Sequence, residues 1–157
     1  MENKSKLHGF FRGVHIRDGK VIDDSGWFPN IITNAGLAQM ALLGGDASAT
    51  PFTYLATGTS NTAVSASQTA LGAEISTVGL SRIGATVSRV TTTVTNDTLQ
   101  LYYEFSVTGT ISVEEVGVFN AASTGTMLAR ALTGTKSFVN GDKYQVTYKV
   151  SFADDGV

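Results

Sequence analysis

The 157-residue chain contains no cysteine, which excludes disulfide bridges, thiolate metal sites and cysteine nucleophiles. Charged side chains are few, and 11 basic against 13 acidic residues leave a net charge of −2. This balance does not suit a protein that binds nucleic acid by neutralising phosphates. Long apolar runs are also missing, so we expect no signal peptide, no membrane-spanning segment, and synthesis in the cytosol without secretion.

Hydroxyl-bearing residues and glycine are abundant, in contrast to the few charged residues. The sequence holds 21 Thr, 14 Ser and 17 Gly, while 42% of its residues are apolar. Thr and Val at this frequency favour strands over helices, and the apolar fraction is large enough for a core. The composition therefore excludes a helical bundle or a coiled coil.

Strict alternation of apolar and polar residues predicts two long strands. Apolar residues occupy the odd positions from 99 to 107 and the even positions from 144 to 152, which gives each strand one buried and one solvated face. Between residues 80 and 95 the alternation changes phase, which predicts a β-bulge near Ser88-Arg89. Turns are predicted at Asp18-Gly19, Asn96-Asp97 and Asn140-Gly141.

One short helix is predicted near residues 34–43, with Thr33 or Asn34 as its N-cap and glycines after its end. Its apolar stripe is expected to comprise Leu37, Met40, Ala41 and Leu43. We predict a mainly β fold, an antiparallel, jelly-roll-like β-sandwich of about seven or eight strands, as a single domain over residues 10–153. Residues 1–9 are expected to form a flexible arm and residues 154–157 a tail.

Candidate catalytic groups are sparse. The only histidines are His8, near the terminus, and His15, which alternates with Val14 and Ile16 and is therefore assigned to a polar surface. Neighbouring Glu114 and Glu115 point to opposite faces of a strand and cannot act together as a glycosidase pair. An inward glutamate needs a cation, so we expect a structural ion pair with Arg82, Arg89 or Arg130. We predict no enzyme activity, no metal site and no cofactor.

Four aromatic residues fall outside the apparent core alternation: Trp27, Tyr54, Tyr102 and Phe138. Aromatic residues are enriched at hairpin ends and subunit interfaces, and they also form stacking platforms for sugars. Because the chain has a single Trp, we favour the interface. The alternative is a carbohydrate-binding surface that uses Trp27 or Tyr102 as stacking platforms.

The order of four motifs is informative. The sequence contains, in this order, NIITNAGLAQMALLGGD, YLATGTSNTAV, QTALGAEI and, after Arg82, VEEVGVFNAASTGTMLAR. This order resembles structural proteins of tailed bacteriophages, in particular small virion proteins and the N-terminal modules of tail-collar fibre proteins. In those proteins an "ITNxGL" helix precedes an "LAxGTG" strand, a "TALxxEI" element and an "ExGxF" strand. The resemblance covers about residues 30–130.

The resemblance implies a non-enzymatic virion protein that forms a homo-oligomer, such as a trimer, and docks on other virion proteins of the capsid or tail. Strand edges and the two terminal segments are the expected means of docking. The alternative function is a carbohydrate-binding module of a fibre tip, which would contact a host glycan through Trp27 or Tyr102. The implied roles of the motif positions are capping, turning and packing. These positions are Thr33, Asn34, Gly36, Leu37, Gly58, Thr59, Glu74, Arg82, Glu115, Gly117 and Phe119.

Overall fold

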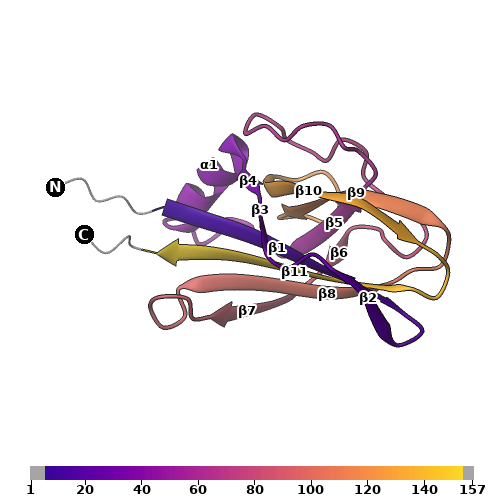
Figure 1. Ribbon diagram of the computed structural model, residues 1–157. Coiled ribbons are helices and arrows are strands. Elements are labelled where there is room, and N and C mark those ends of the chain that lie inside the picture. The colour runs from indigo at the N-terminus through magenta and orange to yellow at the C-terminus, as the bar shows by residue number, and fades with distance from the viewer. Residues whose placement is uncertain (1–5, 154–157) are drawn as a thin grey trace.

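The computed structural model describes residues 6–153, which form two antiparallel β-sheets packed face to face (Figure 1). This arrangement confirms the predicted mainly β fold and the β-sandwich. In chain order the elements are β1 (Lys6–Arg17), β2 (Lys20–Asp24), β3 (Phe28–Pro29), β4 (Ile31–Ile32), α1 (Asn34–Leu43), β5 (Tyr54–Gly58), β6 (Ile83–Gly84), β7 (Thr86–Val90), β8 (Thr98–Ser106), β9 (Ile111–Phe119), β10 (Met127–Phe138) and β11 (Lys143–Ala153).

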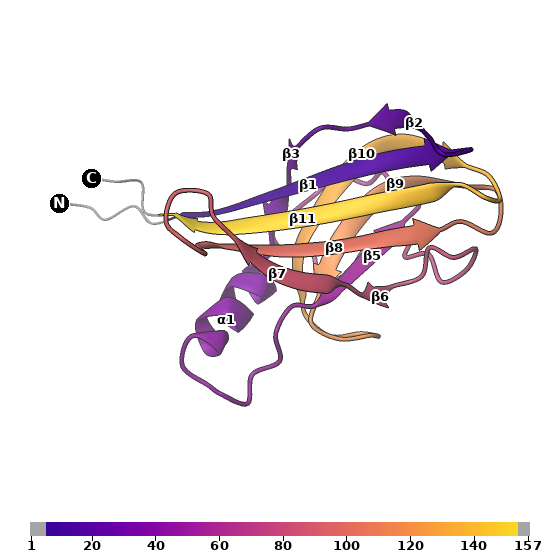
Figure 2. The same ribbon diagram turned by 90° about the horizontal axis from the view of Figure 1, so that it is seen from below.

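The first sheet has the strand order β2-β1-β11-β8-β7, and β3 also pairs with β1. Figure 2 shows its long strands side by side across the molecule. The alternation predicted for β8 and β11 is present, since Leu101, Phe105, Tyr144 and Val146 all turn into the core. Phe152, at the end of β11, departs from it because its side chain is 49% exposed.

The second sheet has the order β4-β10-β9-β5-β6. Its central strand β9 is buried on both faces from Glu115 to Phe119, because the core covers one face and an irregular stretch of chain covers the other. Alternation is therefore lost in this part of β9, as is usual where both faces of a strand are buried.

Eight of the eleven strands in residues 6–153 have five or more residues, in agreement with the predicted seven or eight. The other three, β3, β4 and β6, have two residues each. Two residues cannot display a period of two, so sequence alternation has no means of detecting such strands.

Two predicted boundaries are wrong. β1 begins at Lys6, so residues 6–9 belong to a strand that pairs with β11 and not to a terminal arm. Residues 1–5 of that arm and the tail at 154–157 lie outside the described residues. The β-bulge predicted near Ser88-Arg89 is absent, because β7 pairs with β8 in continuous register from Thr86 to Val90. The irregularity in this region is instead a change of sheet, since β6 belongs to the second sheet and β7 to the first.

Candidate functional site

The motif positions meet on the outer side of the second sheet. Residues 59–82, which we call the covering segment, connect β5 to β6 and contain no regular element beyond an isolated bridge from Gly58 to Glu74. This segment lies against β9 and β10, and the start of α1 lies beside it (Figure 1).

The first motif caps α1 and ties it to β10. Thr33 is the N-cap, because its Oγ1 accepts a hydrogen bond from the Gly36 N–H at 2.8 Å and donates one to the Met127 carbonyl at 2.5 Å. Gly36 is required by close approach, since a Cβ atom there would lie 2.7 Å from the Cα of Leu128. The Asn34 N–H donates to the Ala66 carbonyl, which joins the covering segment to the helix start.

Leu37 does not pack as expected. The N-cap and the predicted helix bounds are confirmed, and Met40 and Leu43 pack against the core. Leu37, however, is 45% exposed, and Ala41 is exposed as well. The buried side of α1 is centred on Gly36, because only a residue without a side chain lets the helix approach β10 this closely.

The second and fourth motifs meet at a buried carboxylate. Glu115 is fully buried, and its carboxylate accepts hydrogen bonds from the Gly72 N–H at 3.0 Å and the Ala73 N–H at 2.8 Å. Gly58 lies directly beneath, where a Cβ atom would be 2.3 Å from Glu115 Oε1. The Thr59 N–H donates to the Ala73 carbonyl at 2.8 Å. These contacts hold the start of the covering segment against Gly72 and Ala73, over β9.

Arg130 is the cation that Glu115 requires. Its Nε donates to Glu115 Oε2 at 2.6 Å, and both side chains are fully buried. Its Nη1 donates to the Thr62 carbonyl at 2.9 Å and to Gln68 Oε1 at 3.1 Å. The predicted structural ion pair is confirmed, with Arg130 as the partner among the three candidates.

The third motif forms a second ion pair at the opposite end of the covering segment. Arg82 makes a two-point contact with the Glu74 carboxylate, with distances of 2.8 and 2.6 Å. Its Nη1 donates to the carbonyls of Ala121 and Thr124 in the β9–β10 turn, and its guanidinium lies 3.6 Å above the ring of Phe119. Gly117 of the fourth motif makes room for this layer, since a Cβ atom there would be 2.8 Å from the side chain of Leu71.

All eleven motif positions thus lie in one layer, where they cap, tie down or make room for the covering segment. Among these positions Thr33, Gly36, Gly58, Glu115, Gly117 and Phe119 are buried, whereas Asn34, Leu37, Thr59 and Glu74 are exposed at the rim of the layer. Two salt bridges and several close-packed glycines attach the irregular covering segment to the second sheet.

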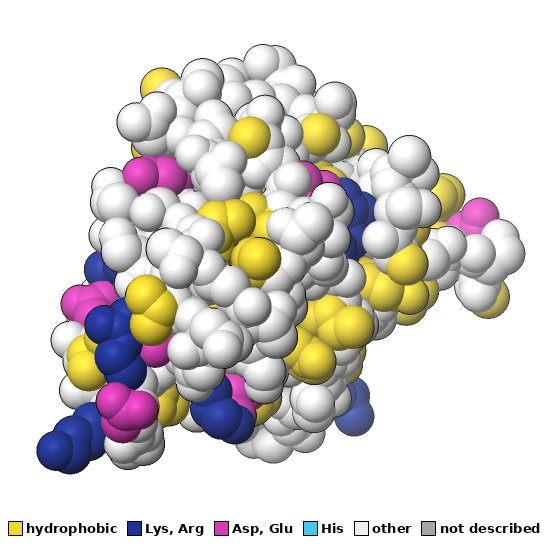
Figure 3. Space-filling view, turned by 90° about the vertical axis from the view of Figure 1, so that its right-hand side faces the viewer, with side chains coloured by type: hydrophobic (Ala, Val, Ile, Leu, Met, Phe, Trp, Pro, Cys, Tyr) yellow, Lys and Arg dark blue, Asp and Glu magenta, His cyan; other side chains and the backbone are white. Residues whose placement is uncertain are grey.

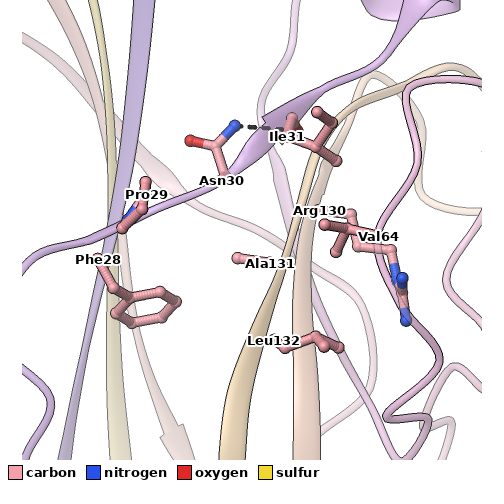
Figure 4. Close-up of a pocket in the computed structure, with 8 residues that line it drawn as sticks. All are labelled: Phe28, Pro29, Asn30, Ile31, Val64, Arg130, Ala131 and Leu132. Carbon is pink, nitrogen blue, oxygen red and sulfur yellow. Dashed lines mark hydrogen bonds between the residues drawn. The ribbon is translucent and has the colours of Figure 1, made fainter.

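A cavity of about 440 Å³ lies beside this layer, between the β3–β4 stretch, Val64 and β10. Figure 4 shows that the guanidinium of Arg130 points away from Phe28 and Asn30, on the side of the covering segment. Asn30 and Arg130 are the polar lining residues, and Asn30 Oδ1 and Arg130 Nη2 are buried without a hydrogen-bond partner among the described residues. The other walls are apolar: Phe28, Pro29, Ile31, Val64, Ala131 and Leu132. Because the amide of Asn30 and the guanidinium of Arg130 point in different directions (Figure 4), these two groups do not form the convergent set that orients a substrate.

The prediction that His15 lies on the surface is wrong, because the residue is buried. Its ring is buried, with Nε2 at 2.7 Å from Asp142 Oδ2 and with the ring centroid 4.0 Å from that of Phe138. Asp142 also receives two hydrogen bonds from Arg17, and this contact above all holds the pKa of Asp142 below its usual range. Because the inward positions of β1 are the odd ones, the apolar character of Val14 and Ile16 was a misleading guide.

The four aromatic candidates do not form one site. Phe138 is fully buried in the core, because a register shift in β10 between Leu132 and Lys136 reverses the alternation. Tyr54 packs on the second sheet with a small apolar cluster. Trp27 and Tyr102 are both associated with the first sheet, and Trp27 is 44% exposed beneath the ammonium group of Lys149, which lies 4.7 Å from its ring.

Charge is distributed unevenly over the two sides of the sandwich. Residues 25–73, which include α1, β5 and much of the covering segment, contain a single charged residue, Asp46. In Figure 3 the upper part of the molecule is mostly white with scattered yellow, whereas blue and magenta groups gather lower down. The ion pairs of the first sheet and its neighbours are Arg12–Asp24, Arg17–Asp142, Lys136–Asp23 and Lys143–Glu104.

Within residues 6–153, no group of three or more His, Cys, Asp or Glu side chains is arranged to hold a metal ion. The helix in this part of the chain is too short to cross a membrane. In comparisons with family models, with curated proteins and with solved structures, nothing matches the chain.

Proposed function

We propose that the protein is a non-enzymatic structural component of a tailed-bacteriophage particle, which oligomerises and docks on the capsid or the tail. The observation that carries the proposal is the structural use of the motif positions. The residues that resemble virion proteins act here as a helix cap, as close-packed glycines and as buried ion pairs of one layer. Such positions suit a rigid scaffold whose surface is its working part.

The surface chemistry supports the same proposal. The side that carries α1 and the covering segment is rich in Thr, Ser and Ala and nearly free of charge. Hydroxyl groups lose water at lower cost than charged groups do, and charged residues are depleted at the centre of protein interfaces. This side is therefore suited to being covered by neighbouring proteins in a virion.

The test is to locate the chain in particles. Particles from the source that encodes the chain are banded by density-gradient centrifugation, probed with an antibody against the purified protein, and imaged after gold labelling. We expect the chain to co-band with the particles and to label one fixed location, on the capsid or on the tail. Recovery of the chain only from the soluble fraction of the lysate would contradict the proposal.

A second candidate function, binding of a host glycan, is favoured by one observation. Phe10 and Lys149 are register partners that face outward from the first sheet, and together with Trp27 they line a shallow cavity of about 250 Å³. Tyr102 lies on the same outer face, opposite Thr147. Exposed aromatic rings beside polar side chains are the usual elements of a sugar-stacking surface.

Glycan arrays followed by isothermal titration separate this candidate from a purely structural role. A glycan-binding protein would show binding constants between about 1 μM and 1 mM that Trp27→Ala abolishes. The matched control is Val87→Ala, since Val87 is equally exposed on β7 but is not part of the aromatic cavity. An array without signal for the unchanged protein removes this candidate.

A further inference from the structure

The outer side of α1 is uncharged, mainly apolar and not covered by any other part of residues 6–153. Ten residues form the helix, and none of them is charged. Its exposed positions are Asn34, Leu37, Ala38, Ala41 and Leu42, which at about 100° per residue share one arc of about 140°. Asn34 and Gln39 are the only polar side chains of α1, and an uncharged, mainly apolar helix is normally buried on most sides. This helix is covered only where it meets β10 and the core.

The exposed arc has a shape that fits a second helix of the same kind. Ala38 and Ala41 lie at its centre, and Leu37 and Leu42 flank them, each close to half exposed. Small central residues allow two helix backbones to approach closely, while larger flanking residues fill the grooves on either side. In an antiparallel pair related by a two-fold axis, Leu37 of one copy would lie at the height of Leu42 of the other, on opposite sides of the contact line.

The surroundings of α1 extend this surface and add one charge, that of Asp46. The Asn34 N–H bonds to Ala66 of the covering segment, and Val64 in that segment is 38% exposed. Asp46, after the helix, already accepts hydrogen bonds from the backbone and hydroxyl of Ser48. A stable interface needs about 800 Å² from each partner, so a ten-residue helix requires these neutral loops beside it.

We propose that α1 and its flanking loops form a two-fold interface with the same surface of a second copy of this chain. The inference rests on the proposed function and names the surface through which the protein oligomerises. A two-fold contact places identical patches together, so a patch must be compatible with itself. A neutral patch with central alanines and flanking leucines meets this condition. It brings no like charges together, and the leucines of one copy pack beside those of the other rather than against them.

The first sheet of a second copy is a poorer partner for the same helix. That contact would remove water from exposed ion pairs, such as Arg12–Asp24 and Lys143–Glu104, without offering α1 an opposite charge. Burial of ion pairs costs free energy that an apolar helix face does not return. Charge compatibility therefore selects the α1 surface of the second copy.

Sedimentation of the full chain between about 1 μM and 1 mM tests the inference. We expect a concentration-dependent dimer or higher oligomer, and we expect Ala41→Glu to weaken its association at least tenfold, because each contact would then bury two like charges. Glu is a good helix former, so this exposed substitution leaves the fold intact. The matched control is Val21→Glu, at a 61% exposed valine of β2, which should leave association unchanged.

Cysteine crosslinking provides an independent readout, since the chain has no cysteine of its own. Ala38→Cys should give a disulfide-linked dimer under mild oxidation, because the two-fold contact brings the two Cα atoms within about 7 Å. Val21→Cys should remain monomeric under the same conditions. A strictly monomeric chain, or an oligomer that Ala41→Glu does not weaken, overturns the inference.

The outcomes also separate this inference from the proposed function. A monomeric chain that still co-bands with particles, and loses this property in Ala41→Glu, shows that α1 docks on a different virion protein, which overturns the inference and supports the function. A chain that dimerises through α1 but never associates with particles supports the interface and contradicts the function.

Discussion

At the scale of single residues, the Glu115–Arg130 pair is the most consequential contact in the molecule. Both side chains are fully buried, so the charges depend on each other and on the backbone groups of the covering segment. Removing water from two ions costs several kcal/mol each, and only close geometry with further hydrogen bonds offsets this cost. Because those further bonds come from residues 60–73, the pair stabilises the covering segment rather than β9 and β10 alone.

Glu115→Gln should lower the free energy of unfolding by about 3–5 kcal/mol, because it leaves a buried guanidinium without its anion. Urea unfolding followed by fluorescence of Trp27 measures this loss. Glu114→Gln is the matched control: its neighbouring carboxylate bonds only to the exposed Thr135 hydroxyl, so a change within about 0.5 kcal/mol is expected. Equal losses in the two variants would contradict the role assigned to the pair.

Asp142 makes the free energy of unfolding depend on pH in the acid range. Its carboxylate is buried and bonds to Arg17, to His15 and to the Val139 N–H, and the Arg17 contact contributes most to holding its pKa below the usual value. An unfolded aspartate has a pKa of about 3.9, so the unfolded chain takes up this proton first as pH falls. The stabilisation by Asp142 is therefore complete above about pH 5 and is lost progressively below it.

Asp142→Asn should consequently lower stability at pH 7, and the difference from the unchanged protein should shrink as the pH falls from about 5 to about 2. Urea unfolding at a series of pH values measures this difference. Asp18→Asn is the control, because Asp18 lies exposed in the β1–β2 turn at a positive φ that asparagine also tolerates. A difference that stays constant with pH would contradict the assignment.

At the scale of elements, α1 depends on the sheet beneath it. A helix of ten residues is marginal by itself in water, so its stability comes from the Thr33 cap and from contact with β10. Gly36 makes that contact possible, because the backbone of Leu128 occupies the space where a side chain would begin. The same glycine that weakens the helix by propensity is therefore what attaches it.

Gly36→Ala should destabilise the protein by about 1–3 kcal/mol, although alanine is the better helix former by about 1 kcal/mol. The steric effect dominates, since the new Cβ would lie 2.7 and 2.8 Å from backbone atoms of Leu128, which have little freedom to move. Thermal unfolding followed by circular dichroism measures the change. Gly45→Ala, where nothing lies within 4 Å of the added Cβ, should be neutral; a stabilised Gly36→Ala protein would disprove the close approach.

At the scale of the whole molecule, the two faces of each strand have different neighbours. Val146 of β11 is 1% exposed and faces the second sheet, while the next residue, Thr147, faces outward between Arg12 and Tyr102. An unpaired charge at position 146 would therefore lie in the core, whereas a charge at position 147 would lie on the outer surface.

Val146→Asp should prevent folding or lower the free energy of unfolding by more than about 4 kcal/mol, because it places an unpaired charge in the core. Thr147→Asp, the adjacent control, should retain nearly all stability, since its charge lies in solvent beside Arg12. Soluble yield and thermal unfolding distinguish the two. If both variants melt like the unchanged protein, the two faces of β11 have been assigned incorrectly.

Sequence patterns are sufficient to predict part of the fold and of the candidate site. The long strands β8 and β11, the α1 bounds and the need of Glu115 for an arginine all follow from local periodicity, capping and the cost of burying charge. His15 and Phe138 were assigned to the wrong side because strand parity must be anchored by a known inward residue, and a register shift in β10 reverses it. No local pattern carries that information.

The sequence by itself determined the class of fold and the character of the surface, because alternation, low charge and abundant hydroxyl groups are local or summed properties of the chain. Tertiary structure alone decided that Arg130 is the partner of Glu115, that four separated motifs share one layer, and that an apolar side of α1 remains uncovered. These features depend on contacts between residues far apart in the chain, and such contacts form only when the two sheets and the covering segment pack together.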